Sequence, residues 1–245
     1  MLIALLHGFW GQGKDGQRLF EALKVKRPLR SSPLRFWAPD LFSQESRWGP
    51  EHGFSQWSRL YVEELLTAAD GDEIVLVGYS LGGRLALHCL KELAQGEARK
   101  PLLTVFLSSN PGLIEKNAVA ARREWEAAWQ RRFKDDDWDT LERDWNALGV
   151  FKASGVSSRA EKDFSRTRLS AALTSWSVTR HQATLSDIKG QAQLWCFGQE
   201  DAKYRVIGAQ VQEITKAPLR FVEGAGHRLL IDASGELAEI IAQAL

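Results

Sequence analysis

Short apolar runs recur along the chain, and the sequence between them has the spacing of amphipathic helices. A short continuous apolar run is typical of a strand buried on both faces of a parallel sheet. The pattern predicts strands at residues 2–6, 34–38, 74–79, 102–107, 193–197 and 219–222. Because helical sequence separates each strand from the next, we predict an α/β fold with a six-stranded, parallel, doubly wound sheet.

The segment between the fourth and fifth predicted strands has a different character. From Asn110 to Ser186 it is charged, rich in tryptophan and without a strand signal. Arg122, Trp125 and Trp129 recur at helical spacing and so share one face of a helix. Such tryptophans either line a pocket or pack helices together. We therefore predict a core of residues 1–109 and 187–245 and a helical insertion over residues 110–186.

Composition restricts the partners of the chain. Its 32 lysines and arginines balance 31 acidic residues, so the formal net charge is +1. No global field therefore recruits nucleic acid or an anionic membrane, and an anionic small molecule would have to be met by local arginines. The histidines and cysteines lack metal-ligand spacing, and no G-x-G-x-x-G opens a helix, so we predict neither a metal nor a cofactor. The sequence does not set the oligomeric state.

The cellular location follows from what the apolar segments and cysteines can do. Met1 to Leu6 is too short for a signal peptide, and no apolar run approaches the ~18 residues of a membrane span. The two cysteines, Cys89 and Cys196, lie in apolar sequence and are predicted to be buried and free. These features favour a reducing compartment, and we predict a cytoplasmic protein without a membrane span.

The third predicted strand runs into Gly78-Tyr79-Ser80-Leu81-Gly82 and then into helical sequence. A G-x-S-x-G motif in this strand–turn–helix context is typical of a nucleophile elbow, in which the serine hydroxyl is exposed above the sheet. The alternative is a glycine-rich turn whose serine only caps the helix. The apolar residues on both sides favour the elbow, and we predict that Ser80 is a nucleophile.

A serine hydroxyl needs a base to take its proton, and the base needs a carboxylate to fix its tautomer. His7 follows the first strand, His52 lies in a surface loop, His88 lies two turns into the helix after Ser80, and His181 ends the insertion. His227 instead follows the last strand, at the edge of the sheet where the elbow opens. His227 is therefore the predicted base.

The acidic partner follows from chain order. Sites built on this elbow follow the order serine, acid, histidine. Asp201 comes just after the fifth predicted strand, whereas Asp187 lies at the junction with the insertion and Asp232 comes after the histidine. We predict a catalytic triad of Ser80, Asp201 and His227.

Several motifs together carry a family resemblance. They are Leu6-His7-Gly8-Phe9 with Gly11, Gly13 and Asp15, Gly78 to Leu87, Asn110-Pro111-Gly112-Leu113, Ala120 to Arg123, Arg131-Arg132-Phe133, Trp145, and Gly198 to Tyr204. The chain resembles the α/β-hydrolase superfamily over its whole length. Within it, the chain is similar to the 2-succinyl-6-hydroxy-2,4-cyclohexadiene-1-carboxylate synthases of menaquinone biosynthesis. The resemblance implies an α/β-hydrolase fold in which residues 110–186 form a helical cap. We expect the sheet to lack the family's N-terminal hairpin, because no strand signal precedes residues 2–6.

The resemblance also implies a reaction and a set of site residues. In these synthases the serine and histidine act as base, pyruvate is eliminated and the ring product is retained. The backbone N–H groups of Phe9 and Leu81 would form the oxyanion hole. Tyr79, Arg84, Arg122 and Trp145 would line the substrate site, with the arginines binding carboxylates of an anionic small molecule. Either Arg166 or Arg168 would add a further arginine.

Two other functions stay open at this point. A carboxylesterase for small acyl esters would use the same residues through an acyl-serine intermediate. A non-catalytic binding protein on the same fold is the other, and its mark would be a missing triad residue. The sequence departs from the synthases at Gly16, where they have tryptophan, and at residues 42–46, which replace a Gly-His-Gly-Ser stretch. These departures concern the substrate rather than the triad.

Overall fold

The computed structural model describes residues 1–26, 33–96, 99–112 and 115–245. Its strands are β1 (Leu2–Leu6), β2 (Arg35–Trp37), β3 (Ile74–Tyr79), β4 (Leu103–Leu107), β5 (Gln193–Gly198) and β6 (Leu219–Val222). They form one six-stranded sheet in the order β2-β1-β3-β4-β5-β6, and all five pairings are parallel. The predicted six-stranded parallel sheet is confirmed.

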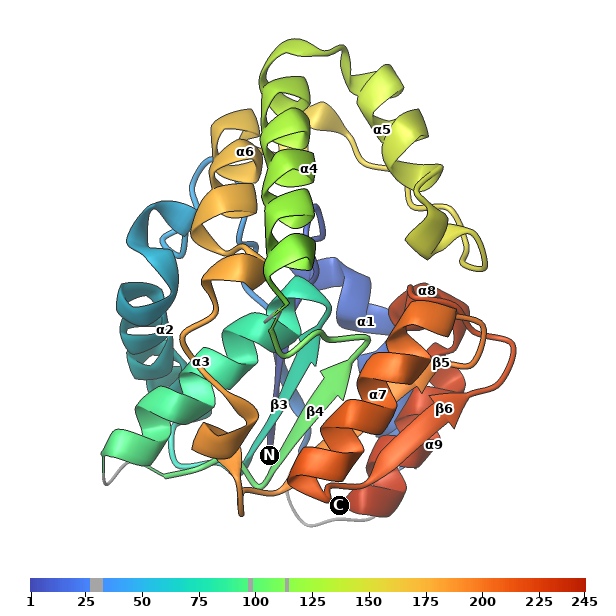
Figure 1. Ribbon diagram of the computed structural model, residues 1–245. Helices are drawn as coiled ribbons and strands as arrows, with labels where there is room; N and C mark the ends of the chain where they lie inside the picture. Colours follow the sequence, from blue (N-terminus) through green and yellow to red (C-terminus); the bar gives the residue numbers. More distant parts are fainter. Residues whose placement is uncertain (27–32, 97–98, 113–114) are drawn as a thin grey trace.

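Helices cover both faces of this sheet (Figure 1). On one face lie α1 (Gln17–Lys26) and α9 (Ser234–Ala244), and on the other lie α2 (Gly53–Ala69), α3 (Leu81–Gln95) and α7 (Ala202–Thr215). Alternate strand residues serve the two faces, so that Ile3 and Val75 pack with α1 and α9, while Ala4 and Leu76 pack with α2 and α3. Burial on both sides explains why each central strand is a continuous apolar run.

The two free cysteines lie on opposite faces of the sheet. Cys89 of α3 belongs to the cluster of buried residues that includes α2, and Cys196 of β5 belongs to the cluster under α1 and α9. Neither side chain is accessible to solvent. Burial raises the pKa of the Cys89 thiol well above its ordinary value and that of Cys196 to about 12.

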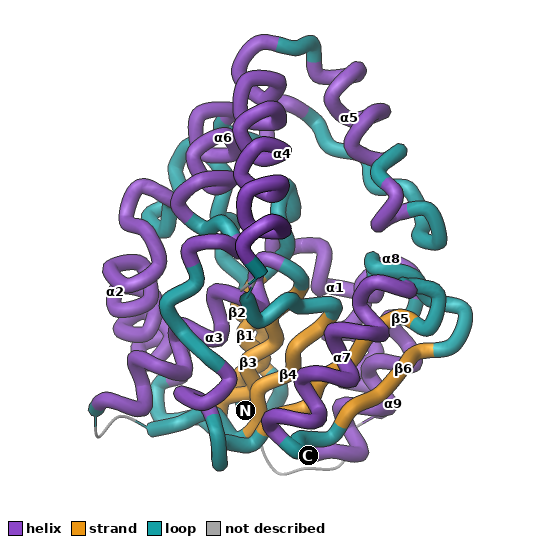
Figure 2. The backbone as a smooth tube through the Cα atoms, in the orientation of Figure 1, coloured by secondary structure: helices purple, strands orange, loops and turns teal. Residues whose placement is uncertain are grey.

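A helical insertion between β4 and β5 stands above the carboxyl ends of the strands (Figures 1 and 2). Its helices are α4 (Lys116–Asp135), α5 (Trp138–Asn146) and α6 (Arg166–Ser175). Between α5 and α6 lie 3-10 turns at Gly149–Phe151 and Glu161–Asp163, and between α6 and β5 lie two more at Val178–Arg180 and Leu185–Ile188. Outside the insertion, the short helix α8 (Leu229–Asp232) lies between β6 and α9. The division into a core and a cap at residues 110 and 186 stays a prediction.

Aromatic side chains attach the insertion to the loop after β1. The Trp10 ring packs edge-on against Phe133 and Trp138, each with centroids 4.9 Å apart, and Phe9 lies 5.0 Å from Trp145. The tryptophans thus pack helices together, and Trp145 also faces a cavity described below. None of the helices in the described ranges combines the length and hydrophobicity needed to cross a membrane.

Candidate active site

Ser80 sits in a strained turn between β3 and α3. Its backbone has φ 53° and ψ −109°, which non-glycine residues rarely adopt. The turn needs glycine at two neighbours, because a Cβ on Gly82 would lie 1.9 Å from the Leu6 carbonyl oxygen and one on Gly78 would lie 2.6 Å from the Gly83 Cα. Ser80 is the residue before α3, yet its side chain does not cap the helix. The hydroxyl is therefore available for another partner.

That partner is His227. The Ser80 Oγ lies 3.1 Å from His227 Nε2, and His227 Nδ1 lies 2.8 Å from Asp201 Oδ2. These contacts fit a ring that donates its Nδ1 hydrogen to the carboxylate and accepts from the serine at Nε2. The structure thus joins three residues that are far apart in the sequence in one chain of hydrogen bonds.

The His227 ring is enclosed by aromatic side chains. Ring centroids of Tyr204, Phe151 and Tyr79 lie 4.5, 5.7 and 5.9 Å from that of His227. The side chains of His227 and Asp201 are each only 4% exposed. A ring packed in this way has little freedom to leave the serine, which is what a base for Ser80 requires.

The loop after β1 is fixed by hydrogen bonds to one carbonyl group. The Gly8 oxygen accepts from the Gly11 N–H at 3.1 Å and from His7 Nδ1 at 2.8 Å, and His7 Nε2 accepts from the Leu41 N–H at 3.0 Å. Because the peptide group is planar and trans, the Phe9 N–H points opposite to the Gly8 carbonyl. Phe9 and Leu81 both line the cavity that contains Ser80.

This cavity has a volume of about 560 Å³ and lies between the sheet and the insertion. Apolar groups make up much of its lining, with polar and charged groups among them. The lining residues that matter below are Phe9, Ser80, Leu81, Arg84, Arg122, Trp125, Glu126, Trp145, Phe151, Lys203, Tyr204 and His227. Within the described part of the chain, three cations, Arg84, Arg122 and Lys203, face one carboxylate, Glu126, so the lining favours an anionic ligand.

Arg84 is the most deeply buried of the three cations, with 9% of its surface exposed. Its Nη2 donates to the Trp176 carbonyl at 3.2 Å, whereas its Nε has no hydrogen-bond partner among the residues the structure describes. Burial, and then the charge of Arg122, lower the pKa of Arg84 to about 10. A buried guanidinium with an unused donor gains from an incoming carboxylate.

Arg122 is already oriented by its own helix. Its Nε donates to Glu126 Oε1 at 2.7 Å, and its guanidinium carbon lies 4.4 Å from the centroid of the Trp125 ring. Glu126 is held in turn by the Ser177 hydroxyl at 2.6 Å. One edge of Arg122 is thus occupied, and the rest of its guanidinium stays available on the cavity wall.

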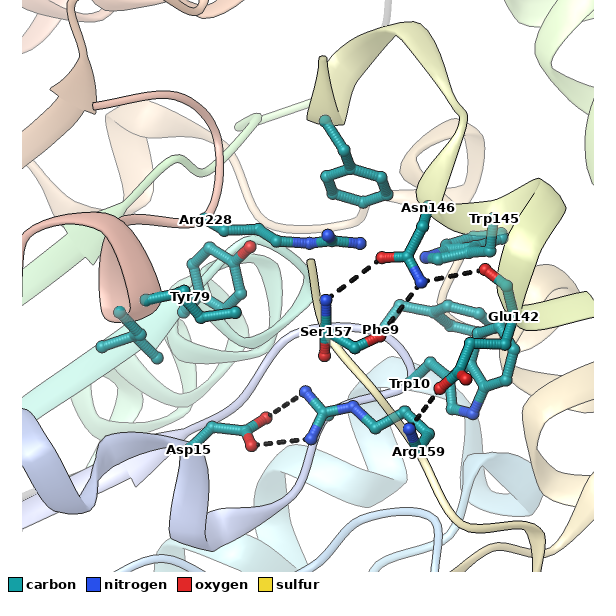
Figure 3. A pocket seen from close by; sticks show the side chains of 14 residues that line it. Phe9, Trp10, Asp15, Tyr79, Glu142, Trp145, Asn146, Ser157, Arg159 and Arg228 are labelled. Carbon is teal, nitrogen blue, oxygen red and sulfur yellow. Dashed lines mark hydrogen bonds and ion pairs between the residues drawn. The ribbon is translucent and has the colours of Figure 1, made fainter. Parts of the chain in front are cut away.

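Three residues suggested for the substrate site lie elsewhere. Tyr79 does not line the cavity around Ser80; it lines a smaller one of about 50 Å³, beside Arg228 (Figure 3). Its ring packs against the buried cluster on the α1 and α9 face of the sheet. Arg166 donates to the Phe133 and Asp136 carbonyls, and Arg168 donates to the Ser43 carbonyl, so neither reaches the larger cavity.

Some lining residues had no individual signal in the sequence. Lys203 stands at the solvent-exposed edge of the cavity, where partial burial and then the charge of Arg122 lower its pKa. It lies two residues after Asp201, within a motif that resembles the synthases, and that position was its available signal. Leu113, part of another such motif, lies outside the described residues. No group of three or more potential metal-ligating side chains occurs in the described ranges.

Comparison with known proteins places the fold in a family. Residues 3–240 match the model of the Alpha/beta hydrolase family. The chain belongs to this family. Among its members, the 2-succinyl-6-hydroxy-2,4-cyclohexadiene-1-carboxylate synthase of Klebsiella pneumoniae subsp. pneumoniae is 28% identical over 99% of this chain and 93% of its own length.

Solved structures of other proteins share the alpha/beta hydrolase fold. MenH from S. aureus superposes with a TM-score of 0.76 at 19% identity, covering 100% of this chain and 93% of that one. A carboxylesterase from Nitrososphaera gargenis gives a TM-score of 0.70 at 12% identity, covering 99% and 88%. At these identities the structural likeness concerns the fold alone.

Proposed function

We propose that this alpha/beta hydrolase eliminates pyruvate from an anionic ring substrate by proton abstraction, forming 2-succinyl-6-hydroxy-2,4-cyclohexadiene-1-carboxylate in menaquinone biosynthesis. The observation that carries the proposal is that Arg84 and Arg122 line the same cavity as the Ser80 hydroxyl and the His227 ring. The similarity to the Klebsiella synthase over nearly the whole chain supports it.

In the proposed reaction Ser80, His227 and Asp201 act together as the base. Ser80 and His227 take a proton from a ring carbon, and the C–H electron pair forms a ring double bond. The C–O bond breaks with its electron pair going to the leaving enolpyruvate, which takes up the proton from His227 and is released as pyruvate. The Phe9 and Leu81 N–H groups stabilise negative charge that develops on a substrate oxygen. Arg84 and Arg122 hold the carboxylates, and Trp145 packs against the ring.

The competing function is a carboxylesterase, which would use Ser80 as a nucleophile in the same cavity. A small neutral ester presents no carboxylate to the arginines, so the elimination depends on Arg84 and Arg122 whereas ester cleavage does not. Kinetics on an anionic and a neutral substrate therefore separate them.

The test compares arginine variants on both substrates. Because a charge-assisted hydrogen bond contributes roughly 1.5 to 3 kcal/mol, Arg84→Ala or Arg122→Ala should lower kcat/KM for pyruvate release by about ten- to a hundredfold. Turnover of a p-nitrophenyl ester should barely change. The matched control is Arg131→Ala, since Arg131 is an exposed residue of the same helix as Arg122 and lies outside the cavity.

Two outcomes would count against the proposal. Equal losses on both substrates would show that the arginines serve the structure, which a thermal unfolding midpoint for each variant would reveal directly. No pyruvate release by the unmodified protein, together with rapid ester turnover, would favour the carboxylesterase.

A further inference from the structure

The segment between α5 and α6, residues 149–163, touches two separate loops of the site, and we call it the strap. It begins with the turn Gly149–Phe151 and ends with the turn Glu161–Asp163. The first loop follows β1 and carries Phe9, and the second follows β6 and carries His227. In the sheet β1 and β6 are separated by β3, β4 and β5, so backbone pairing does not join the two loops directly.

The first half of the strap is bonded to the His227 loop. The Arg228 N–H donates to the Ser154 hydroxyl at 2.9 Å, and Arg228 Nη1 donates to the Gly155 carbonyl at 2.8 Å. The Gly155 N–H donates back to Asp232 Oδ1 at 2.8 Å. The strap backbone and the loop are so close that a Cβ on Gly226 would lie 2.5 Å from the Ala153 oxygen.

The second half of the strap is bonded to the Phe9 loop. Both terminal nitrogens of Arg159 donate to the Asp15 carboxylate, each at 2.8 Å (Figure 3). Asp15 Oδ2 also accepts from the Gln12 N–H at 2.9 Å. The side chains of Arg159 and Asp15 are only 14% and 19% exposed, so this two-bond ion pair is partly shielded from water.

The strap is itself anchored on α5. The Ser157 N–H donates to Asn146 Oδ1 at 3.2 Å, Asn146 Nδ2 donates to the Ser157 carbonyl at 3.0 Å, and the Arg159 N–H donates to Glu142 (Figure 3). One short segment is therefore bonded to a helix and to both loops. We propose that the strap sets the position of the His227 ring and the Phe9 N–H relative to Ser80, with Arg159, acting through Asp15, and Ser154 as positioning residues.

This inference rests on the roles proposed for Ser80, His227 and the Phe9 N–H, but not on the identity of the substrate. Arg159 and Ser154 lie outside the cavity that contains Arg84 and Arg122. Their loss should therefore slow the chemistry of Ser80 without weakening the binding of an anionic substrate. A small misplacement of reacting groups suffices, since about 1 Å can cost ~100-fold in rate.

The test measures the reactivity of Ser80 with a small neutral alkyl fluorophosphonate. In that reaction the Ser80 oxygen forms a bond to phosphorus, fluoride leaves and the hydroxyl proton passes to His227. Arg159→Gln and Asp15→Asn should each lower the second-order labelling rate constant about tenfold, and the double variant should lose no more than either single one, as expected for two residues of one interaction. Ser154→Ala should lower it about fivefold.

Further measurements separate positioning from mere stability. The KM for the anionic substrate should change less than about twofold in each variant while kcat falls. Arg159→Lys, which keeps the charge but not the two-pronged geometry, should recover part of the rate. Arg143→Gln is the matched control, because this α5 arginine is 69% exposed and pairs only with Asp144 among the described residues.

Each result bears on one proposal. Labelling of Arg159→Gln and Ser154→Ala at the unmodified rate, or losses of the Arg159 and Asp15 variants that multiply in the double variant, would overturn the positioning role. If the unmodified protein is not labelled at Ser80, with Ser80→Ala as reference, the proposed roles of Ser80 and His227 fail, and the positioning role falls with them. Labelling at Ser80 without pyruvate release would reject the proposed substrate and leave the strap proposal standing.

Discussion

Asp201 uses its two carboxylate oxygens for different partners. Oδ2 lies 2.8 Å from His227 Nδ1, while Oδ1 accepts from the Tyr204 N–H at 3.3 Å and so caps α7. One side chain thus starts a helix and orients the imidazole. The position between β5 and α7 therefore suits both a helix cap and a hydrogen-bond partner of His227.

Replacing Asp201 should separate the two uses. Asn is as good a helix cap as Asp, so Asp201→Asn should leave the unfolding midpoint nearly unchanged. Without the carboxylate the imidazole loses its favoured tautomer, and kcat on an ester or on the ring substrate should fall by about 10³- to 10⁴-fold. Asp135→Asn is the control, because Asp135 is an exposed residue at the end of α4 and lies outside the cavity. A loss of similar size in both variants would refute the assignment.

At the scale of single residues, the position of a residue relative to a strand end was a better guide to the candidate site than its residue type. Ser80, Asp201 and His227 each follow a strand, and parallel strands bring such positions to one edge. Arg166 and Arg168 instead lie on α6, where the direction of a long side chain depends on neighbours that the sequence does not reveal. Both bind backbone carbonyl groups, so the sequence could not assign either to the site.

At the scale of elements, the elbow depends on the close passage of α3 over β1. Gly82→Ala would put a Cβ 1.9 Å from the Leu6 carbonyl oxygen, and backbone cannot yield cheaply there. We expect a loss of about 3 kcal/mol in the free energy of unfolding, measured by urea titration.

A second glycine provides the contrast for this element. Gly235 lies in α9, and a Cβ there would meet nothing within 4 Å, so Gly235→Ala should raise the free energy of unfolding by roughly 0.5 kcal/mol. Equal effects at the two sites would mean that helix propensity, rather than the approach to Leu6, decides both.

Strands were predicted to within one residue at each end, but helices of the insertion were not. A buried strand is recognised in the sequence by its apolar run, as in Ile74–Tyr79. In the helical insertion predicted over residues 110–186, the stretch from 160 to 180 contains only α6 as an α-helix, because Ser165 caps its start and Trp176 closes its last turn. Such ends depend on hydrogen bonds that periodicity does not encode.

At the scale of the whole molecule, stability should depend on pH through buried neutral histidines. His88 stacks on Phe54 at 4.0 Å between centroids, and its Nε2 accepts from the Gln182 and Ala183 N–H groups. Burial lowers the pKa of His88 to about 4 and that of the adjacent His181 to about 3. These rings join α2 and α3 to the end of the insertion in their uncharged form.

The sign of the pH effect follows from these values. The unfolded chain binds a proton near pH 6.5, whereas folded His88 does so only near pH 4, so acid favours unfolding in that interval. His88 alone should cost about 3 kcal/mol between pH 6.5 and 4. We expect the free energy of unfolding, measured by urea titration at several pH values in this range, to change less steeply with pH in His88→Gln than in the unmodified protein. His52→Gln, on the turn before α2, is the control. An unchanged slope in His88→Gln would contradict the prediction.

The modification rate of each buried cysteine should report how often its surroundings open. A thiol reagent reacts with the thiolate, so each cysteine of the folded protein should not react until the structure around it opens. Cys89 lies under α2 and Cys196 lies under α1 and α9, so the two modification rates, resolved by mass spectrometry of peptides, would time the opening of each face of the sheet separately. Equal rates would mean that the two faces unfold as one cooperative unit, and unequal rates would tell which face gives way first.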